Sequence, residues 1–586
     1  MKSAGWVKCV ETVCVGALLA GCLWCILQPM VADGAALRAD TGQAGAWTVF
    51  YRYGSVGVVG LWMAALLLPQ RWIHRLPDMA AWMLMGMVIW ETVVALEQLY
   101  GERLSNHALY RFTGTFLNPG PFCGFIAMGM PLALHVLMDV DKRETGMSGE
   151  SESRLPQWME RLVCRAAKMI AYLTLLLCLL LLPAGMSRSA WVAATVGCVA
   201  VVMMHRWERC REWWRVFRRS RKRQMAVLLL AVGCVTAGWG AFNLKRESAN
   251  GRLFMWKIAS LVIAERPWTG YGGEGFQAAF ARRQERYFAA GNGTDGERYV
   301  AGTPEHAFNE YLTTTVKYGV GGVLLMVAIG GTALACAWRM RAYGIAASLL
   351  AVAVFAWSSY PLQLPDFGSA VAVLVVVPIC TYCREWAVRT SGKRGRHRWL
   401  AALLVSAVLA VPFVWWRMKQ AARWQMRDEA AQAWSLARTL YNIKAYETVC
   451  KDYALLYERM GWNDDYLFEY GRALHYAERY EESMKILKEA EAVCGDPMIL
   501  NLCGKNHEAM GEYDLAARCY QQAYDRVPSR LYPLYLLMEM YASPACGKKE
   551  KAKEVAQTIV KTKEKVPSQA VEDMKRRAKE ILQGGD

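Results

Sequence analysis

The chain has 586 residues, of which 54% are hydrophobic, and soluble proteins usually contain about 45 to 50% apolar residues. Its net charge of +18 comes from lysines and arginines that concentrate in short segments between apolar runs, so the charge indicates membrane topology and not nucleic-acid binding. The sequence has no GxxxxGK[ST] phosphate-binding loop and no tight His/Cys/Asp spacing, so neither an ATPase nor a metal site is indicated.

The apolar runs are the first predicted elements. Each is close to the roughly 20 residues that cross a hydrocarbon core as a helix, and none follows residue 416. We therefore predict an all-α protein in which residues 1–416 form a polytopic bundle of about eleven transmembrane helices. The runs are 6–27, 52–69, 77–96, 120–139, 166–184, 188–204, 225–242, 319–338, 344–361, 368–383 and 399–416.

The basic residues predict how these spans are threaded. Segments 205–224 and 384–398 are rich in Lys and Arg, and such loops face the cytoplasm. With a cytoplasmic N-terminus, alternating spans place the long loop 243–318 and the C-terminal domain on the outer face. The interpretation is a multi-pass membrane protein whose long loop and C-terminal domain lie on the outer face of the cytoplasmic membrane.

Two short polar motifs lie at the outer ends of spans. Gly114–Pro119, which contains Asn118, precedes the fourth span, and Ser187–Trp191, which contains Arg188, opens the sixth. An arginine at a span end can simply snorkel to the interface, although positive charge is less expected on the outer side. A functional and a structural role are therefore both open for Arg188.

The long loop joins two spans by many more residues than the other connections, and loops of this kind are usually functional. Its cations, which include Arg252 and Arg266, can bind a diphosphate, because a guanidinium group grips phosphate bidentately. The loop also carries many carboxylates, so ordinary surface ion pairs are the alternative. Its GxGxxG pattern at Gly270–Gly275 lacks the flanking strand and helix of a dinucleotide site, and we interpret it as a turn.

The loop re-enters the membrane at a polar segment that contains His306, with Asn309 and Glu310 close behind. A neutral imidazole can take a proton from an acceptor hydroxyl while arginines hold a leaving diphosphate. The alternative is a histidine that only makes a structural hydrogen bond or caps the next helix.

Residues 417–586 contain no apolar run and are predicted to form a helical-repeat domain. Gly471 and Ala490 are matched 33 residues later by Gly504 and Ala523. A repeat near 34 residues, with small residues where two helices touch, is typical of tetratricopeptide repeats. Stacked helix pairs leave a face for a partner, so docking of a protein or of glycan machinery is one interpretation, and a stabilising appendage is the other.

Taken in order, these motifs resemble the superfamily of O-antigen ligases and O-antigen polymerases, which also includes bacterial protein O-oligosaccharyltransferases. The likeness covers roughly residues 50–380. It rests on GTFxNP at 114–119, SRxAW at 187–191, Arg252 with Trp256, PxxGxGxxxF at 267–276, and HxxNEYL from His306.

The resemblance implies transfer of a glycan from an undecaprenyl-diphosphate-linked donor to an acceptor hydroxyl at the periplasmic face, without metal, nucleotide or other cofactor. By this analogy His306 and Arg252 are the candidate catalytic residues: Arg252, together with Arg188, binds the donor diphosphate, and His306 is the base. Further candidates for substrate binding are Arg266, Asn309, Glu310 and Asn118.

One position departs from the family pattern. Family members often have His immediately before the Asn, where this chain has Phe308. Either His306 serves from two residues earlier, or Glu305 or Glu310 takes the proton. The helical-repeat domain is an addition to the family pattern, so the acceptor, whether lipid, glycan or protein, does not carry over.

Other functions remain open at this point. A protein O-oligosaccharyltransferase is a close rival, because helical repeats can present a protein acceptor. A flippase or transporter of lipid-linked glycan would show repeats among its spans and polar residues at mid-membrane, whereas the polar residues here gather in the long loop. A membrane scaffold would recruit partners through its repeats and tolerate point changes in the loop.

Overall fold

The computed structural model describes residues 75–146, 157–209, 211–212, 225, 246–273, 275–364, 366–386 and 429–584. Within these residues every regular element is a helix and none is a strand, which confirms the all-α prediction. The predicted spans 6–27, 52–69 and 399–416 lie outside the described residues, as does nearly all of 225–242.

Six of the described helices are long and apolar enough to cross a membrane, and a seventh apolar helix, α15 (Tyr343–Ala356), is shorter. These helices coincide with the predicted runs from 77–96 to 368–383 that fall within the described residues. The six are α5 (Leu76–Tyr100), α6 (Pro119–Gly146), α7 (Gln157–Ala184), α8 (Arg188–His205), α14 (Glu310–Arg339) and the helix Asp366–Trp386.

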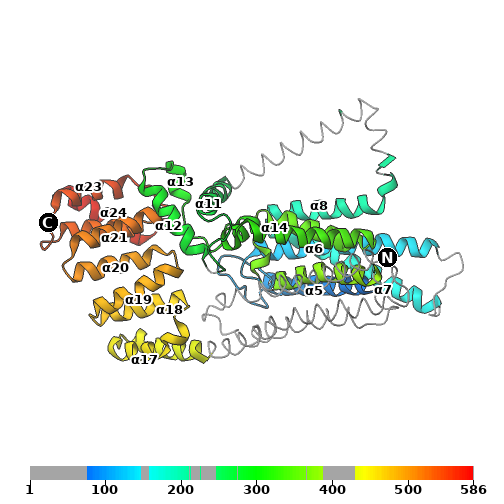
Figure 1. Ribbon diagram of the computed structural model, residues 1–586, viewed down its shortest axis with the longest axis horizontal. Helices are drawn as coiled ribbons and strands as arrows, with labels where there is room; N and C mark the ends of the chain where they lie inside the picture. Colours follow the sequence, from blue (N-terminus) through cyan, green and yellow to red (C-terminus); the bar gives the residue numbers. More distant parts are fainter. Residues whose placement is uncertain are drawn as a thin grey trace, which may run out of the picture.

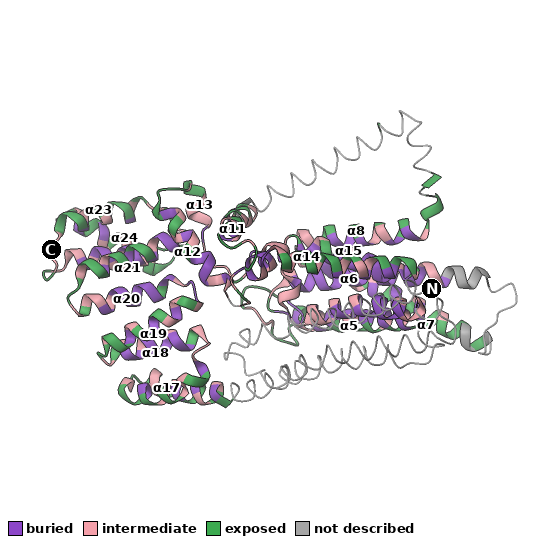
Figure 2. Cartoon of the chain, viewed as in Figure 1, coloured by how far each residue is buried: buried purple, intermediate pink, exposed green. Residues whose placement is uncertain are grey.

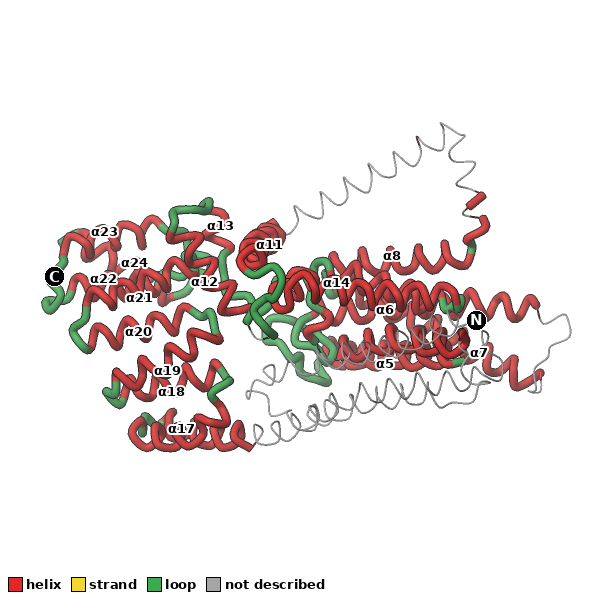
Figure 3. Tube along the Cα trace, viewed as in Figure 1, coloured by secondary structure: helices red, strands yellow, loops and turns green. Residues whose placement is uncertain are grey.

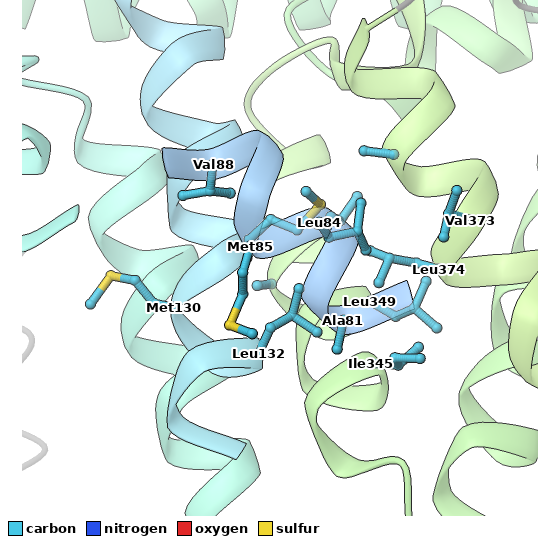
Figure 4. Close-up of a cluster of buried hydrophobic side chains, with 14 of the residues drawn as sticks. Ala81, Leu84, Met85, Val88, Met130, Leu132, Ile345, Leu349, Val373 and Leu374 are labelled. Carbon is cyan, nitrogen blue, oxygen red and sulfur yellow. The ribbon is translucent and has the colours of Figure 1, made fainter. Parts of the chain in front are cut away.

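The bundle is built around α6, of which 89% of the most apolar window is buried. Leu84 and Val88 of α5 pack in one core with Leu132 of α6, Leu349 of α15 and Leu374 of the helix Asp366–Trp386 (Figure 4). Lipid tails are as apolar as these side chains, so close packing rather than removal from water stabilises such a core inside a bilayer.

Three helices of the long loop lie between the bundle and the C-terminal helices (Figure 1). Phe254, Phe280 and Phe288 are buried in an apolar core of their own, so this part of the chain is folded rather than an open connection. The three helices are α11 (Arg246–Glu265), α12 (Phe276–Ala289) and α13 (Asp295–Val300).

The glycine-rich segment of the loop packs backbone against backbone on α14. The amide of Gly272 donates to the carbonyl oxygen of Lys317 at 2.9 Å. Gly270 and Gly319 have φ angles of 64° and 70°, a region that L side chains rarely adopt. A Cβ atom at Gly270 would lie 2.4 Å from the Lys317 oxygen, and one at Gly319 would lie 2.2 Å from the Trp268 oxygen. The glycines therefore form a turn, as predicted, and a kink in α14.

We expect Gly319→Ala to lower the thermal stability of the purified protein. The residue would hold a strained positive φ angle, which costs about 1–3 kcal/mol, and its methyl group would also clash with a backbone carbonyl. Gly321→Ala is the matched control, because a Cβ atom there has nothing within 4 Å. Thermal unfolding in detergent compares the two variants, and equal midpoints would contradict the steric argument.

The C-terminal helices pack as successive neighbours, with α18 on α19, α20 on α21 and α22 on α23. Figure 2 shows their buried residues on the faces where the helices meet. They are a helix over 429–442, α17 (Tyr446–Met460), α18 (Asp464–Tyr476), α19 (Tyr480–Val493), α20 (Pro497–Ala509), α21 (Tyr513–Arg526), α22 (Tyr532–Ala542), α23 (Lys549–Lys561) and α24 (Gln569–Leu582).

The 33-residue period corresponds to equivalent contacts in two helix pairs. A Cβ atom at Gly471 would meet Leu487 at 2.6 Å, and one at Gly504 would meet Tyr520 at 2.4 Å. The small residues thus lie where the two helices of each pair touch. The described C-terminal region is helical and paired, while its assignment to tetratricopeptide repeats stays a prediction.

Candidate functional site

Side chains from five separate parts of the chain meet where the bundle adjoins the helices of the long loop. The connecting segments gather in this region, between the bundle and α12 (Figure 3). The contributing parts are the segment before α6, the start of α8, the first half of α11, the segment 304–309, and the connection between α15 and the 3₁₀ turn η2 (Pro361–Gln363).

Arg252 is a partly buried cation on α11. Its Nη1 donates to the carbonyl oxygen of Ser358 at 2.9 Å, and its guanidinium lies 5.5 Å from the centre of the Phe308 ring. Burial lowers the pKa of Arg252, the charge of Arg188 lowers it further, and Tyr360 opposes both effects. Two like charges are therefore held near each other at a partly dry position, which an anion between them would stabilise.

Arg188 is the first residue of α8. The N-terminus of a helix carries partial positive charge and unpaired N–H groups, which favour a bound anion. The predicted pair of donor-binding arginines, Arg188 and Arg252, is thus brought together by two helices that are distant in the sequence.

His306 lies against the ring of Tyr360. The two ring centres are 5.1 Å apart and the planes are tilted by 34°. The backbone next to His306 is anchored by Trp256, whose indole nitrogen donates to the carbonyl oxygen of Ala307 at 3.0 Å. Within the described residues, the buried Nδ1 atom of His306 has no hydrogen-bond partner.

Burial lowers the pKa of His306 to about 3, and the charge of Lys317 contributes to this shift. The imidazole is therefore neutral at physiological pH, as a general base must be. A base with so low a pKa is weak, and a negative charge close to the ring would raise the pKa.

Phe308, which stands where the family often has histidine, is turned toward the same cluster. Its φ angle is 48°, and its ring lies edge-on to Tyr360 with the ring centres 5.1 Å apart. In this place it shapes the apolar wall beside Arg252 and cannot carry a proton.

Tyr360 was not predicted from the sequence, although it contacts two of the motifs. It lies against His306 and Phe308, and its hydroxyl accepts a hydrogen bond from Nδ2 of Asn118 at 3.5 Å. No spacing or local pattern distinguishes it from the other tyrosines of the chain. The proline that follows it, at the start of η2, was the one available signal of a fixed turn.

The segment that carries Asn118 is fixed to α5. The side-chain oxygen of Gln98 accepts from the amides of Thr113 and Gly114 at 2.8 and 2.9 Å. The Glu91 carboxylate accepts from the amide and the hydroxyl of Thr115 at 3.0 and 2.6 Å. These contacts explain the polar residues of α5 and hold the GTFxNP motif in place.

Asn309 and Glu310 make structural contacts at the start of α14. The Asn309 side chain accepts from the amide of Leu312 at 3.1 Å and caps the helix. The buried Glu310 carboxylate accepts from Gln363 at 2.5 Å, and the Gln363 oxygen accepts from Lys317 at 2.6 Å. Their predicted role in substrate binding stays a prediction.

Arg266 is not brought to this cluster. It is exposed at the other end of α11, where its guanidinium lies 4.9 Å from the centre of the Tyr271 ring. Fourteen residues of helix separate it from Arg252, about 21 Å along the axis. Other loop cations form surface ion pairs, such as Lys257 with Glu297 at 2.7 Å, so the ion-pair alternative describes that part of the loop.

The depressed pKa of His306 predicts acid sensitivity. Between about 3 and 6.5, the unfolded chain binds a proton at this histidine that the folded protein does not bind. The free energy of unfolding therefore falls as the pH is lowered through this window. We expect His306→Gln to lose less thermal stability than wild type between pH 7 and pH 4, measured by unfolding at each pH. Parallel pH profiles would show that His306 is not held neutral by burial.

Residues 173–327 match the family model described as O-antigen ligase. This stretch runs from α7 into α14 and contains Arg188, Arg252 and His306. No curated protein sequence matches the chain. The family match and the apolar helices make the chain a multi-pass membrane protein with a domain of the type that carries out ligase- or polymerase-type glycan transfer.

Proposed function

From the O-antigen ligase domain at residues 173–327, we propose that the protein transfers a glycan from an undecaprenyl-diphosphate-linked donor to an acceptor hydroxyl at the periplasmic face of the bacterial inner membrane. The observation that carries the proposal is the pair of neighbouring cations, Arg188 at the start of α8 and Arg252 on α11. Tyr360, which interacts with Arg252, also lies against the neutral imidazole of His306.

In this reaction the acceptor oxygen forms a bond to the anomeric carbon of the donor, and the bond from that carbon to the diphosphate oxygen breaks. The diphosphate leaves with the electron pair, and the acceptor proton passes to His306. Arg188 and Arg252 stabilise the charge that develops on the diphosphate. Two preorganised arginines can do so without a metal ion, so we propose a metal-independent transferase.

A protein acceptor is the second candidate, as in a protein O-oligosaccharyltransferase. One observation favours it: the C-terminal helices pack directly on α12 of the loop, with contacts from both α19 and α21. A protein bound by the C-terminal domain would therefore be held near the loop that carries Arg252. This proposal includes a division into two domains, residues 1–416 and 417–586, and a protein partner that binds the second domain.

The test is glycan transfer by purified protein in nanodiscs, supplied with a lipid-linked glycan and with lipid, glycan or protein acceptors. We expect wild type to transfer in the presence of chelator and His306→Ala to lose about 100- to 10,000-fold in rate. Transfer that needs added metal would refute the metal-independent mechanism. Movement of the lipid-linked glycan between leaflets without transfer would support a flippase. If the wild-type protein neither transfers nor moves the glycan, the result would support a membrane scaffold.

A further inference from the structure

A patch of cations lies where the long loop rests on the start of the apolar part of α14. Arg283 and Arg286 of α12 place their guanidinium groups 3.5 and 3.0 Å from Oε1 of Glu265, at the end of α11. The guanidinium of Arg266 lies 4.9 Å from the centre of the Tyr271 ring, and the Tyr271 hydroxyl donates to Oε2 of Glu265 at 2.7 Å. Three guanidinium groups thus gather around one carboxylate.

The positive charge of this patch is only partly balanced among the described residues. Glu265 is shared by Arg283 and Arg286, and Glu285, the one carboxylate of α12, pairs with Arg526 of the C-terminal helices instead. The buried Nε atom of Arg283 has no hydrogen-bond partner within the described residues. The side chain of Arg286 is 57% exposed, so it can reach an anion outside the protein.

The backbone fixes this patch at the level where α14 enters the membrane. The amide of Val320 donates to the carbonyl oxygen of Pro267 at 2.8 Å, directly after the kink at Gly319. From there α14 continues as an apolar helix with exposed side chains, which include Leu324 and Val327. Exposed apolar side chains of a membrane span face the lipid tails. The segment around Pro267 therefore lies at the boundary between membrane and water.

Trp268, which follows Pro267, is an exposed aromatic residue at this boundary. Its relative exposure is 77%, so packing inside the protein does not explain it. Tryptophan is enriched at membrane–water interfaces, where its ring meets the apolar region and its N–H group stays near the headgroups. Arginine binds phosphate through paired hydrogen bonds. The two residue types together match a phospholipid, whose phosphate and acyl chains lie at these two depths.

The patch is separate from the candidate donor site. Arg266 and Arg252 lie at opposite ends of α11, about 21 Å apart along the helix axis. A diphosphate group is much shorter than this distance, so one donor headgroup cannot occupy both places.

We propose that the patch formed by Arg266, Arg283, Arg286 and Trp268 binds the headgroup of an anionic phospholipid at the membrane surface on the side of the long loop. Charge complementarity favours an anionic phospholipid, because a zwitterionic headgroup carries a cation of its own that the arginines repel. The bound lipid holds α11 and α12 against the bilayer and so keeps the helices of the loop at a fixed height above it. The proposal rests on membrane embedding and not on glycan transfer.

The experiment identifies the phospholipid beside Trp268. The full-length protein, with the photo-crosslinking amino acid p-benzoyl-phenylalanine in place of Trp268, is irradiated in nanodiscs of equal parts phosphatidylglycerol and phosphatidylcholine. Among the crosslinked lipids, measured by mass spectrometry, we expect about fivefold or more phosphatidylglycerol over phosphatidylcholine. Combining Arg266→Gln with Arg286→Gln should bring this ratio close to one, and added salt should lower it. The control is Arg530→Gln, which removes an exposed ion pair with Asp496 and should leave the ratio unchanged.

Four results would overturn the proposal. They are a ratio near one without further substitution, an unchanged ratio in the double variant, the absence of any lipid crosslink, and displacement of phosphatidylglycerol by an added undecaprenyl-diphosphate-linked glycan. The last result would assign the patch to the donor. Thermal unfolding of the same samples separates a lost contact from a misfolded loop. If the double variant is unstable, Arg266→Gln alone, at an exposed side chain, takes its place and should lower the ratio by about twofold or more.

Discussion

We expect Arg252→Ala to lower the catalytic efficiency of the proposed glycan transfer by about 100- to 1,000-fold, the usual cost of removing one preorganised group that stabilises developing charge. The guanidinium is held by the Ser358 carbonyl and the Phe308 ring, so it is oriented before a donor binds. Arg252→Lys keeps the charge but loses the planar fork that matches two phosphate oxygens. Its activity should therefore lie between those of wild type and the alanine variant.

Initial rates at several donor concentrations measure this effect. Lys257→Ala is the matched control, because Lys257 is an exposed cation on the same helix that pairs with Glu297 on the surface. If Arg252→Ala and Lys257→Ala lose activity equally, the loss reflects the stability of α11. If Arg252→Ala keeps wild-type rates, the arginine pair does not bind the leaving group.

The sequence distinguished these two classes of arginine poorly. Arg252 and Arg266 belong to one loop and carry the same charge, and both were candidates for binding substrate. In the folded protein, Arg252 lies at the partly buried end of α11, beside Arg188, whereas Arg266 is exposed at the far end. Burial depends on which distant segment packs on each end of the helix, and that information is absent from the local pattern.

Features with a local cause were predicted well. The apolar runs of the described residues are helices because length and hydropathy are properties of a continuous segment. The turn at Gly270 was predicted because glycine and proline restrict the backbone in their own vicinity. The paired C-terminal helices were predicted because the small residues Gly471 and Gly504 repeat after 33 residues.

Contacts between distant segments were not predictable in the same way. Tyr360 contacts His306 and also Asn118, which is 242 residues away in the sequence. The hydrogen-bonded series of Lys317, Gln363 and Glu310 links α14 to η2. Each of these residues is an ordinary polar side chain in its local sequence. A single sequence carries no signal of such pairing.

The contact between the long loop and the C-terminal helices was also not predicted from the sequence. It depends on a buried arginine, Arg526. Arg526 of α21 is 2% exposed, and its guanidinium donates to Glu285 of α12 at 2.8 Å and to Glu491 of α19 at 2.7 Å. The carbonyl oxygen of Arg526 accepts a further hydrogen bond from Gln284. One buried cation thus joins the loop to two C-terminal helices.

We expect Arg526→Ala to destabilise this contact by about 3–5 kcal/mol, because it leaves Glu285 and Glu491 facing each other without a counter-charge. Hydrogen–deuterium exchange should then rise in α12 and α21, while the bundle helices keep their protection. The control is Arg530→Ala, which removes an exposed ion pair with Asp496 and should cost less than about 1 kcal/mol.

A double change tests whether charge or packing holds the contact. If the ion pair acts mainly through the cost of unpaired buried charge, Glu285→Met combined with Arg526→Met should recover much of the stability that Arg526→Met alone loses. Unchanged exchange in α12 of Arg526→Ala would instead mean that apolar contacts, such as that of Ala281 with Gly495, suffice to dock the domain. The protein-acceptor proposal requires that the C-terminal domain is docked on α12. If Arg526→Ala loses both the exchange protection of α12 and the transfer to a protein acceptor, this contact is connected to function.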